Sequence, residues 1–212
     1  MSKLASAPAA LTSPAAKLSR RAFVVGLPLF AAGCVSTDYG HRTDGGHSIA
    51  AIDTTTIDGA LMRTEVAWTG KEKPGTVVVN IKQRRLYVVE GDGRATRYGI
   101  GVGRSEGANF RGTGVVGRKE KWPYWTPTAN MMRAIPEYRP FAKGLDGGEG
   151  NPLGPRALYL YRDGKDTMFR LHGTIEPETI GQAVSSGCIR LFNQDIIDLY
   201  DRVPLGAQVK VI

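Results

Sequence analysis

From Pro74 to the C-terminus, the chain is a succession of short segments rich in Val, Ile and Tyr, separated by turns that contain Gly. The first two, TVVVNI and RRLYVVE, are separated only by Lys82 and Gln83, which is typical of a β-hairpin. Such a series predicts a mainly β, sandwich-like domain. The other predicted strands are ATRYGIGVG (95–103), GTGVVGR (112–118), RALYLY (156–161), TMFRLHG (167–173) and AQVKVI (207–212).

Helical signals are confined to two places. Residues 129–134 form a short apolar segment with Thr128 as its N-cap, and the helix is expected to stop before Pro136. A second helix is expected from about residue 194 to 202, with Asn193 as its N-cap and an apolar face. The predicted fold is therefore β-rich with a few short helices.

Residues 119–156 lack strand periodicity and form a long insert between two predicted strands. Loops of this length in a compact domain are usually lids or binding loops. Trp122, Tyr124 and Trp125 could form one wall of a groove, or they could simply cover the sheet. GIGVGR, at 99–104, lacks the third glycine and the acidic residue of a dinucleotide site, so we interpret it as a turn or strand feature.

Residues 1–34 have the features of an export signal: a basic, acid-free leader followed by the apolar run AFVVGLPLFAAG. SRRAFV resembles a twin-arginine signal, and Sec export is the alternative. Small residues before Cys34 resemble a lipoprotein cleavage box, in which this cysteine is lipidated. The alternative is ordinary signal-peptidase cleavage nearby, without an anchor. Residues 35–73, rich in Thr, Asp and Gly, are expected to be a flexible spacer ending in a short arm around 62–68 that packs on the domain.

The net charge of +8 suits a polyanionic partner such as nucleic acid, anionic lipid or a cell-wall polymer. Nucleic acid is not favoured, because the chain has no basic block of five residues and no zinc-finger cysteine pairs. Two cysteines and three histidines at long spacings also exclude a structural zinc site and a disulfide framework.

Residues 171–195, LHGTIEPETIGQAVSSGCIRLFNQD, contain the thiol of Cys188 and the imidazole of His172. A cysteine attacks as its thiolate, and a nearby imidazole can take the thiol proton. The segment between them contains Gly181 and is long enough to double back. A buried cysteine and an unrelated, hydrogen-bonded histidine are the structural alternative.

The residues around Cys188 would serve the same chemistry. Gly187 allows a sharp turn, so that the N–H groups of Gly187 and Cys188 could form an oxyanion hole. Ser185 and Ser186 could hydrogen-bond to the turn or to the imidazole. Arg190 could bind a substrate carboxylate or pair with a structural acid such as Asp195, and the structural role is favoured.

HGT followed by IGQAVSSGCIRLFNQD resembles the signature of the L,D-transpeptidase (YkuD-type) family. The resemblance covers about residues 74–212, and NPLGPRALYLY, which contains Tyr159, resembles the strand that enters the family's active site. Many members have His where this chain has Ser186, so His172 is left as the one imidazole base. The matching positions are His172, Gly173, Ser185, Gly187, Cys188, Arg190 and Asn193.

The resemblance implies a β-sandwich catalytic domain with a long active-site insert and no metal or organic cofactor. Cys188 would attack a tetrapeptide stem of peptidoglycan, His172 would act as general base and acid, and the Gly173 carbonyl would orient the imidazole. The acyl group would pass to the amine of another stem, giving a 3→3 cross-link, or to an outer-membrane protein. Carbapenems would acylate Cys188.

Two alternatives stay open: a carboxypeptidase or amidase that uses the same thioester, and a non-catalytic wall-binding lipoprotein. The resemblance further implies export to the periplasm of a Gram-negative bacterium. The membrane would be a partner only through a lipid anchor on Cys34.

Overall fold

The computed structural model describes residues 39–212, which belong to one compact unit. The predicted signal segment 1–34, with Cys34, lies outside the described residues. Strands dominate the described part, which confirms the expected mainly β class. Among the helices of residues 39–212, none is long and apolar enough to cross a membrane.

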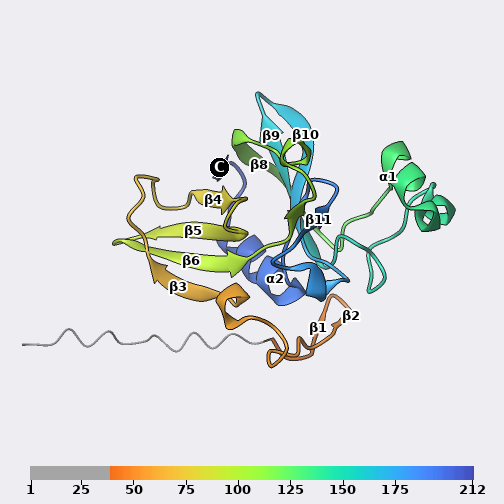
Figure 1. Cartoon of the computed structure of the whole chain (residues 1–212), viewed down its shortest axis with the longest axis horizontal. Helices are drawn as coiled ribbons and strands as arrows, with labels where there is room; N and C mark the ends of the chain where they lie inside the picture. The colour runs from red at the N-terminus through yellow and green to blue at the C-terminus, as the bar shows by residue number, and fades with distance from the viewer. Residues whose placement is uncertain (1–38) are drawn as a thin grey trace, which may run out of the picture. The chain divides into compact units, whose positions relative to one another are not determined.

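The largest sheet of the described residues has nine strands in the order β12-β10-β9-β8-β13-β4-β5-β6-β3 (Figure 1). Sequential strands pair antiparallel through much of it, whereas β13 runs parallel to β4 and β12 runs parallel to β10. The bounds are β3 Thr64–Ala67, β4 Val77–Asn80, β5 Arg85–Gly91, β6 Arg94–Gly99, β8 Gly112–Lys121, β9 Arg156–Arg162, β10 Lys165–His172, β12 Ile189–Arg190 and β13 Gln208–Val211.

The predicted strands are all present, and β4 and β5 form the expected hairpin, with Val78 opposite Tyr87. Figure 1 shows two groups of strands, β3 to β6 and β8 to β10, set at an angle to each other. Buried side chains of both groups belong to one hydrophobic core, for example Leu86 and Leu158. The long sheet thus turns back on itself to enclose the core, as a sandwich does.

Two α-helices occur in the described residues. Helix α1 (Ala129–Ala134) begins at Thr128, whose side chain accepts a hydrogen bond from the Met131 N–H, as predicted. Helix α2 (Asn193–Arg202) packs its apolar face into the core. Its N-cap is Phe192, without a side-chain cap, so the expectation that Asn193 caps this helix is wrong.

The short elements complete the fold. Strand β7 (Val102–Gly103) pairs in parallel with β11 (Ala183–Ser185) in a small second sheet. Four 3₁₀ helices lie in connections of residues 39–212: Gly59–Leu61, Glu106–Ala108, Pro136–Phe141 and Pro177–Thr179.

The described part of the expected spacer contains strands and contacts the domain. Strands β1 (Arg42–Asp44) and β2 (His47–Ile49) form a hairpin, and β3, within the region where a short arm was expected, adds an edge strand to β6. Tyr39, which is buried, donates a hydrogen bond to both carboxylate oxygens of Asp195 at 2.9 and 3.0 Å. These contacts hold residues 39–52 against helix α2.

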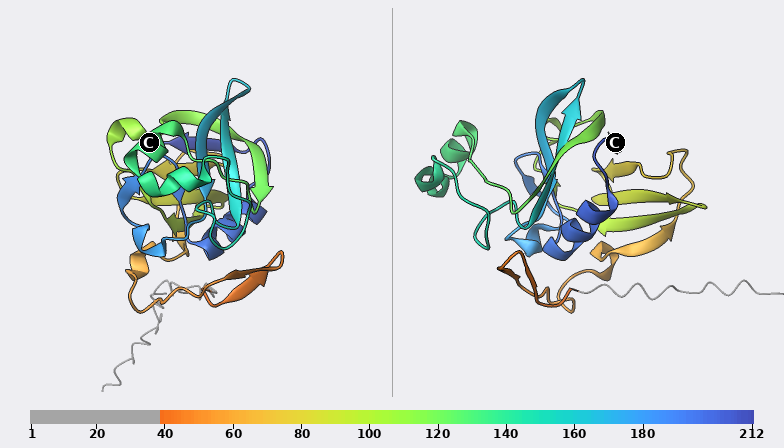
Figure 2. Two further views of the ribbon diagram at one scale, coloured as in Figure 1. Left: turned by 90° about the vertical axis from the view of Figure 1, so that its right-hand side faces the viewer. Right: turned by 180° about the vertical axis from the view of Figure 1, so that it is seen from behind.

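The predicted insert lies between the end of β8 and the start of β9, and it carries α1 away from the sheet (Figures 1 and 2). Asn151 is buried at its base and donates hydrogen bonds to the carbonyl groups of Pro123, Leu145 and Asp146. Trp125 and Leu145 exchange backbone hydrogen bonds of 2.9 and 2.8 Å. The insert is therefore a closed loop with its own hydrogen bonds.

Candidate active site

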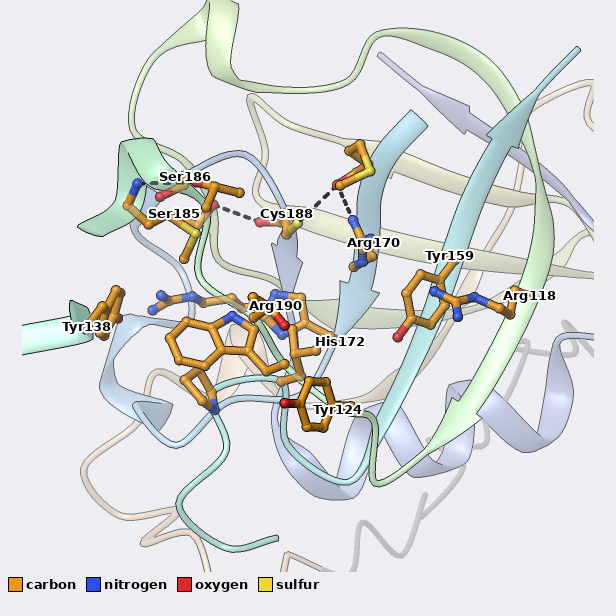
Figure 3. A pocket seen from close by; sticks show the side chains of 17 residues that line it. Arg118, Tyr124, Tyr138, Tyr159, Arg170, His172, Ser185, Ser186, Cys188 and Arg190 are labelled. Carbon is orange, nitrogen blue, oxygen red and sulfur yellow. Dashed lines mark hydrogen bonds between the residues drawn. The ribbon is translucent and has the colours of Figure 1, made fainter. Parts of the chain in front are cut away.

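Two parallel strands bring Cys188 and His172 to one cleft. In β10 and β12, Leu171 lies opposite Ile189 and His172 lies opposite Arg190. Because side chains alternate along strands, Arg190 and Cys188 face the same side as His172. All three line a cleft of about 320 Å³, as Figure 3 shows. The doubling back that the sequence required is therefore provided by this strand pair.

His172 is buried, with 5% of its surface exposed. Its Nδ1 atom lies 2.6 Å from the carbonyl oxygen of Gly173. Since a carbonyl only accepts, Nδ1 carries the proton and Nε2 is the basic nitrogen. Burial lowers the pKa of His172 to about 3, and the positive charges of Arg190 and Arg170 act in the same direction. The imidazole is therefore neutral at physiological pH.

Cys188 is half-buried, and its Sγ atom lies 3.9 Å from the carbonyl oxygen of Met168. Burial raises the pKa of the Cys188 thiol above its ordinary value, because the thiolate loses hydration. The charge of Arg170, and then that of Arg190, oppose this effect. The resting side chain is therefore a thiol with guanidinium groups nearby.

The turn before Cys188 is held by Ser185. Its hydroxyl donates to the Cys188 carbonyl at 2.7 Å and accepts the Gly187 N–H at 3.1 Å. Gly187 has φ of 131°, and a Cβ there would overlap the carbonyl oxygen of Ala108. Of the two partners expected for Ser185, the turn and the imidazole, it is the turn that its hydroxyl binds here. The Gly187 N–H, expected in an oxyanion hole, is engaged by Ser185, whereas Ser186 lines the cleft.

Arg190 and Asn193 have structural contacts. The Arg190 Nη1 atom lies 2.5 Å from Glu176 and 3.3 Å from the Thr179 hydroxyl. Arg190 thus pairs with an acid, but the acid is Glu176 rather than Asp195. Asn193 does not line the cleft; its side-chain oxygen accepts the Thr174 N–H at 2.9 Å and so fixes the loop that follows His172.

The insert supplies one wall of the cleft. Tyr124 and Trp125 line it, and Trp125 packs edge-on against Tyr138 with ring centres 5.1 Å apart. Trp122 does not line it, contrary to expectation. Its indole N–H donates to Asp44 at 2.8 Å and its ring lies 4.4 Å from His47, so it serves the contact with residues 39–52.

Tyr159 lines the cleft as expected, between two arginines that the sequence interpretation missed (Figure 3). The guanidinium carbons of Arg118 and Arg170 lie 3.7 and 4.7 Å from the centre of its ring. Its hydroxyl donates to Glu120 at 2.8 Å, and burial raises its pKa to about 12. Arg170 lies two positions before His172 in one strand, a spacing that could have identified it. Nothing in the sequence pointed to Arg118.

No group of three or more His, Cys, Asp or Glu side chains within residues 39–212 could hold a metal ion. The glycine segment at 99–104 packs against the protein itself. A Cβ at Gly101 would lie 3.0 Å from the Thr179 carbonyl, and one at Gly103 would lie 2.9 Å from Asn109. These contacts agree with its interpretation as a strand and turn feature.

The family model of the L,D-transpeptidase catalytic domain (YkuD) matches residues 74–211. The probable L,D-transpeptidases ErfK/SrfK and YbiS of Escherichia coli (strain K12) are each 37% identical over 142 residues. The matched region is 64% of this chain and 43% or 44% of those proteins, so the chain spans less than half the length of these relatives.

A solved structure from Brucella melitensis is 47% identical, with a TM-score of 0.50, and the match covers 76% of this chain and 99% of that one. It is described as a probable carnitine operon oxidoreductase. That description belongs to the Brucella protein. In the present chain the glycine segment is packed against Thr179 and Asn109.

Proposed function

The chain belongs to the L,D-transpeptidase catalytic domain (YkuD) family, and we propose that Cys188 is its nucleophile, forming a thioester with a peptidoglycan tetrapeptide stem. The observation that carries this proposal is the parallel pairing of β10 with β12, which brings the thiol and the neutral imidazole of His172 into one cleft. Because the chain spans under half of its curated relatives, its substrate and acceptor are part of the proposal.

In the first step, His172 Nε2 takes the thiol proton while Cys188 Sγ attacks the carbonyl carbon of the third residue of the stem. The C–S bond forms, the amide C–N bond breaks, and the imidazolium returns the proton to the amine of the departing D-Ala. In the second step an acceptor amine gives up a proton to His172 and forms a new amide. The C–S bond breaks and the thiol is restored.

The neutral state of His172 suits this sequence, since only a neutral imidazole can accept a proton. Its hydrogen bond to the Gly173 carbonyl supports the proposed orienting role of Gly173. We assign the oxyanion-hole donor to the Cys188 N–H. The Gly187 N–H would join it only if it left the Ser185 hydroxyl, to which it is bound here.

The cleft has the features that a stem peptide requires. Tyr124 and Trp125 give the cleft aromatic surface, and β8, β10 and β12 contribute arginines to its lining. Stem peptides carry carboxylates, so positive charge in the cleft favours their approach. The proposed acceptors are the side-chain amine of another stem and a lysine of an outer-membrane protein.

Export to the periplasm and a lipid anchor on Cys34 remain proposals, because residues 1–34 lie outside the described part of the chain. The mass of the mature N-terminus tests the anchor. A diacylglyceryl-modified Cys34 supports it, and an unmodified start after residue 34 overturns it.

The central experiment is incubation of the purified protein with disaccharide-tetrapeptide, followed by mass spectrometry of protein and products. An acyl-enzyme at Cys188 and a cross-linked dimer would establish a transpeptidase. Tripeptide alone would identify the alternative, a hydrolase that uses the same thioester. No acyl-enzyme and no product would support a non-catalytic wall-binding protein. Cys188→Ala is the matched control in each assay.

A further inference from the structure

Arg170 and Cys188 lie next to each other across the β10–β12 pair. Leu171 is opposite Ile189, so the preceding residues of the two chains, Arg170 and Cys188, are neighbours. Both side chains line the cleft (Figure 3). The chain thus places a guanidinium beside the thiol.

Arg170 differs from the other arginines of the cleft in its charge balance. Arg118 lies 2.7 Å from Glu120, and Arg190 lies 2.5 Å from Glu176. For Arg170, the ion pair within residues 39–212 is the one with Asp166, at 3.7 Å. Its side chain is only 17% exposed, so water compensates its charge poorly. Its charge is therefore the least balanced of the three.

An irregularity in β10 fixes the position of this guanidinium. The register shifts between Asp166 and Arg170, and Met168 adopts a φ of 64°, which is unusual for a residue with a side chain. As a result, the Met168 carbonyl accepts a hydrogen bond from Arg170 Nη1 and also lies 3.9 Å from Cys188 Sγ. The ring of Tyr159 supports Arg170 from the side.

A thiolate at Cys188 would need a cation, and His172 is neutral in the resting site. The titratable and charged groups that line the cleft are Arg118 on β8, Tyr159 on β9, Arg170 and His172 on β10, Cys188, Arg190 on β12, and Tyr124 and Tyr138 of the insert. The insert adds no charged residue to this lining. Of the charges that lower the pKa of the Cys188 thiol, that of Arg170 has the largest effect, before that of Arg190.

We infer that Arg170 is a positioning residue whose fixed guanidinium stabilises the Cys188 thiolate. The inference rests on the proposed function only in taking Cys188 as the nucleophile. The neighbouring arginines then have other main tasks: Arg190 holds the loop through Glu176, and Arg118 holds Tyr159 and Glu120. Arg170 opposes the effect of burial on the Cys188 thiol and so makes its ionisation less costly, without protonating His172.

The test is the rate of Cys188 alkylation by iodoacetamide as a function of pH, measured by mass spectrometry on the purified protein. Loss of a cation beside a thiolate shifts its pKa by about one unit or more. We therefore expect Arg170→Gln to move the profile upward by about one pH unit and to slow alkylation about tenfold at pH 7. Arg170→Lys, which keeps the charge, should recover at least half of that shift.

Arg162→Gln, on the neighbouring strand and outside the cleft, is the control for the overall loss of one charge and should leave the profile unchanged. Arg118→Gln should shift it by less than half as much as Arg170→Gln. Thermal melting shows whether each variant is folded, and if Arg170→Gln is not, the comparison uses Arg170→Lys and Arg170→Met. An unshifted profile for the uncharged Arg170 variant, or an equal shift for Arg170→Lys, would overturn the inference. Iodoacetamide needs no peptidoglycan, so a failed transpeptidase assay would not affect this result.

Discussion

The carbonyl oxygen of Gly173 accepts a hydrogen bond from Nδ1 of His172 at 2.6 Å, and this contact sets the tautomer of the buried imidazole. The proton is held on Nδ1 by the residue that follows His172 in the chain, so Nε2 is left as the acceptor. A short local contact therefore orients the base before any substrate binds.

His172→Gln should separate base catalysis from thiol reactivity. Glutamine retains a polar group of similar size but cannot take the thiol proton, so acylation by a tetrapeptide donor should fall by about a hundredfold or more at pH 7. Iodoacetamide alkylation at high pH, where hydroxide removes the proton, should stay close to wild type. Equal losses in both assays would point to a disrupted cleft rather than a missing base.

Cys188→Ala should abolish acylation and leave the fold intact, because the side chain is half-buried and its contact with the Met168 carbonyl is long, at 3.9 Å. We expect no mass increase with a carbapenem or a tetrapeptide donor, with retained binding to sacculi. Ser186→Ala, a change in the adjacent turn, is the matched control and should still be acylated. A covalent adduct on Cys188→Ala would contradict the proposed nucleophile.

Gly187→Ala should destabilise the turn that carries Cys188. The φ of 131° and the overlap of a new Cβ with the Ala108 carbonyl require the backbone to move, at a cost of about 2 kcal/mol or more. Urea denaturation measures this cost. Gly107→Ala is the control, since a Cβ there would meet no atom within 4 Å, and its stability should change by less than about 1 kcal/mol.

Asp44→Asn should loosen the contact between residues 39–52 and the sheet. Asp44 forms two 2.7 Å contacts with Arg156, whose side chain is 4% exposed, so its loss leaves a buried charge without its partner. We expect a loss of about 2 kcal/mol in the free energy of unfolding, less than for a fully buried pair because Asp44 is partly exposed. Glu65→Gln, from the exposed pair with Arg94 at 3.7 Å, should cost less than about 0.5 kcal/mol. Similar losses for both variants would contradict this prediction.

Asp195 and His172 should give the stability opposite dependences on pH. Burial raises the pKa of Asp195 to about 7, so the folded state holds a proton that the unfolded state releases above its ordinary pKa of 3.8. The stability from Asp195 is present below pH 3.8 and is lost as the pH rises towards 7. Burial lowers the pKa of His172 from 6.5 to about 3, so its contribution is lost as the pH falls through that range. Between about pH 4 and 6.5 the two effects offset each other.

Replacing either residue should therefore leave the pH dependence of the unfolding free energy that the other residue causes. In Asp195→Asn, the free energy of unfolding should rise with pH by up to about 1.4 kcal/mol per unit between pH 4.5 and 6. In His172→Gln it should fall with pH over the same interval. Urea denaturation at several pH values measures both slopes. Parallel pH profiles for the two variants would show that one of these shifts has the wrong direction.

The strands of the core were predictable because their signal is local. TVVVNI and RRLYVVE carry β-branched and aromatic side chains around a short turn, and they form the expected hairpin of β4 and β5. The cap of helix α1 at Thr128 depends on residues within one turn, and it too agrees with the sequence. The motif around Cys188 also specified the family.

The partners of individual side chains were not predictable, because they depend on which distant segments meet. Asn193 was a good candidate cap by its type, but its side chain bonds to the loop after His172, which only the sheet brings close. Trp122 belongs to the insert by sequence, yet its indole N–H donates to Asp44 of the β1–β2 hairpin. These contacts join residues that lie far apart in the chain.

The sequence by itself determined the β-rich class, the family, and the thiol and imidazole of the candidate site. The tertiary structure decided the charge environment of that site: Glu176 neutralises Arg190, Ser185 engages the Gly187 N–H, and the bulge at Met168 places Arg170 beside Cys188. The physical reason is the separation along the chain of the residues that interact. Strand and cap signals depend on residues close in sequence, whereas these hydrogen bonds, ion pairs and burial depend on segments that meet only in the folded sheet.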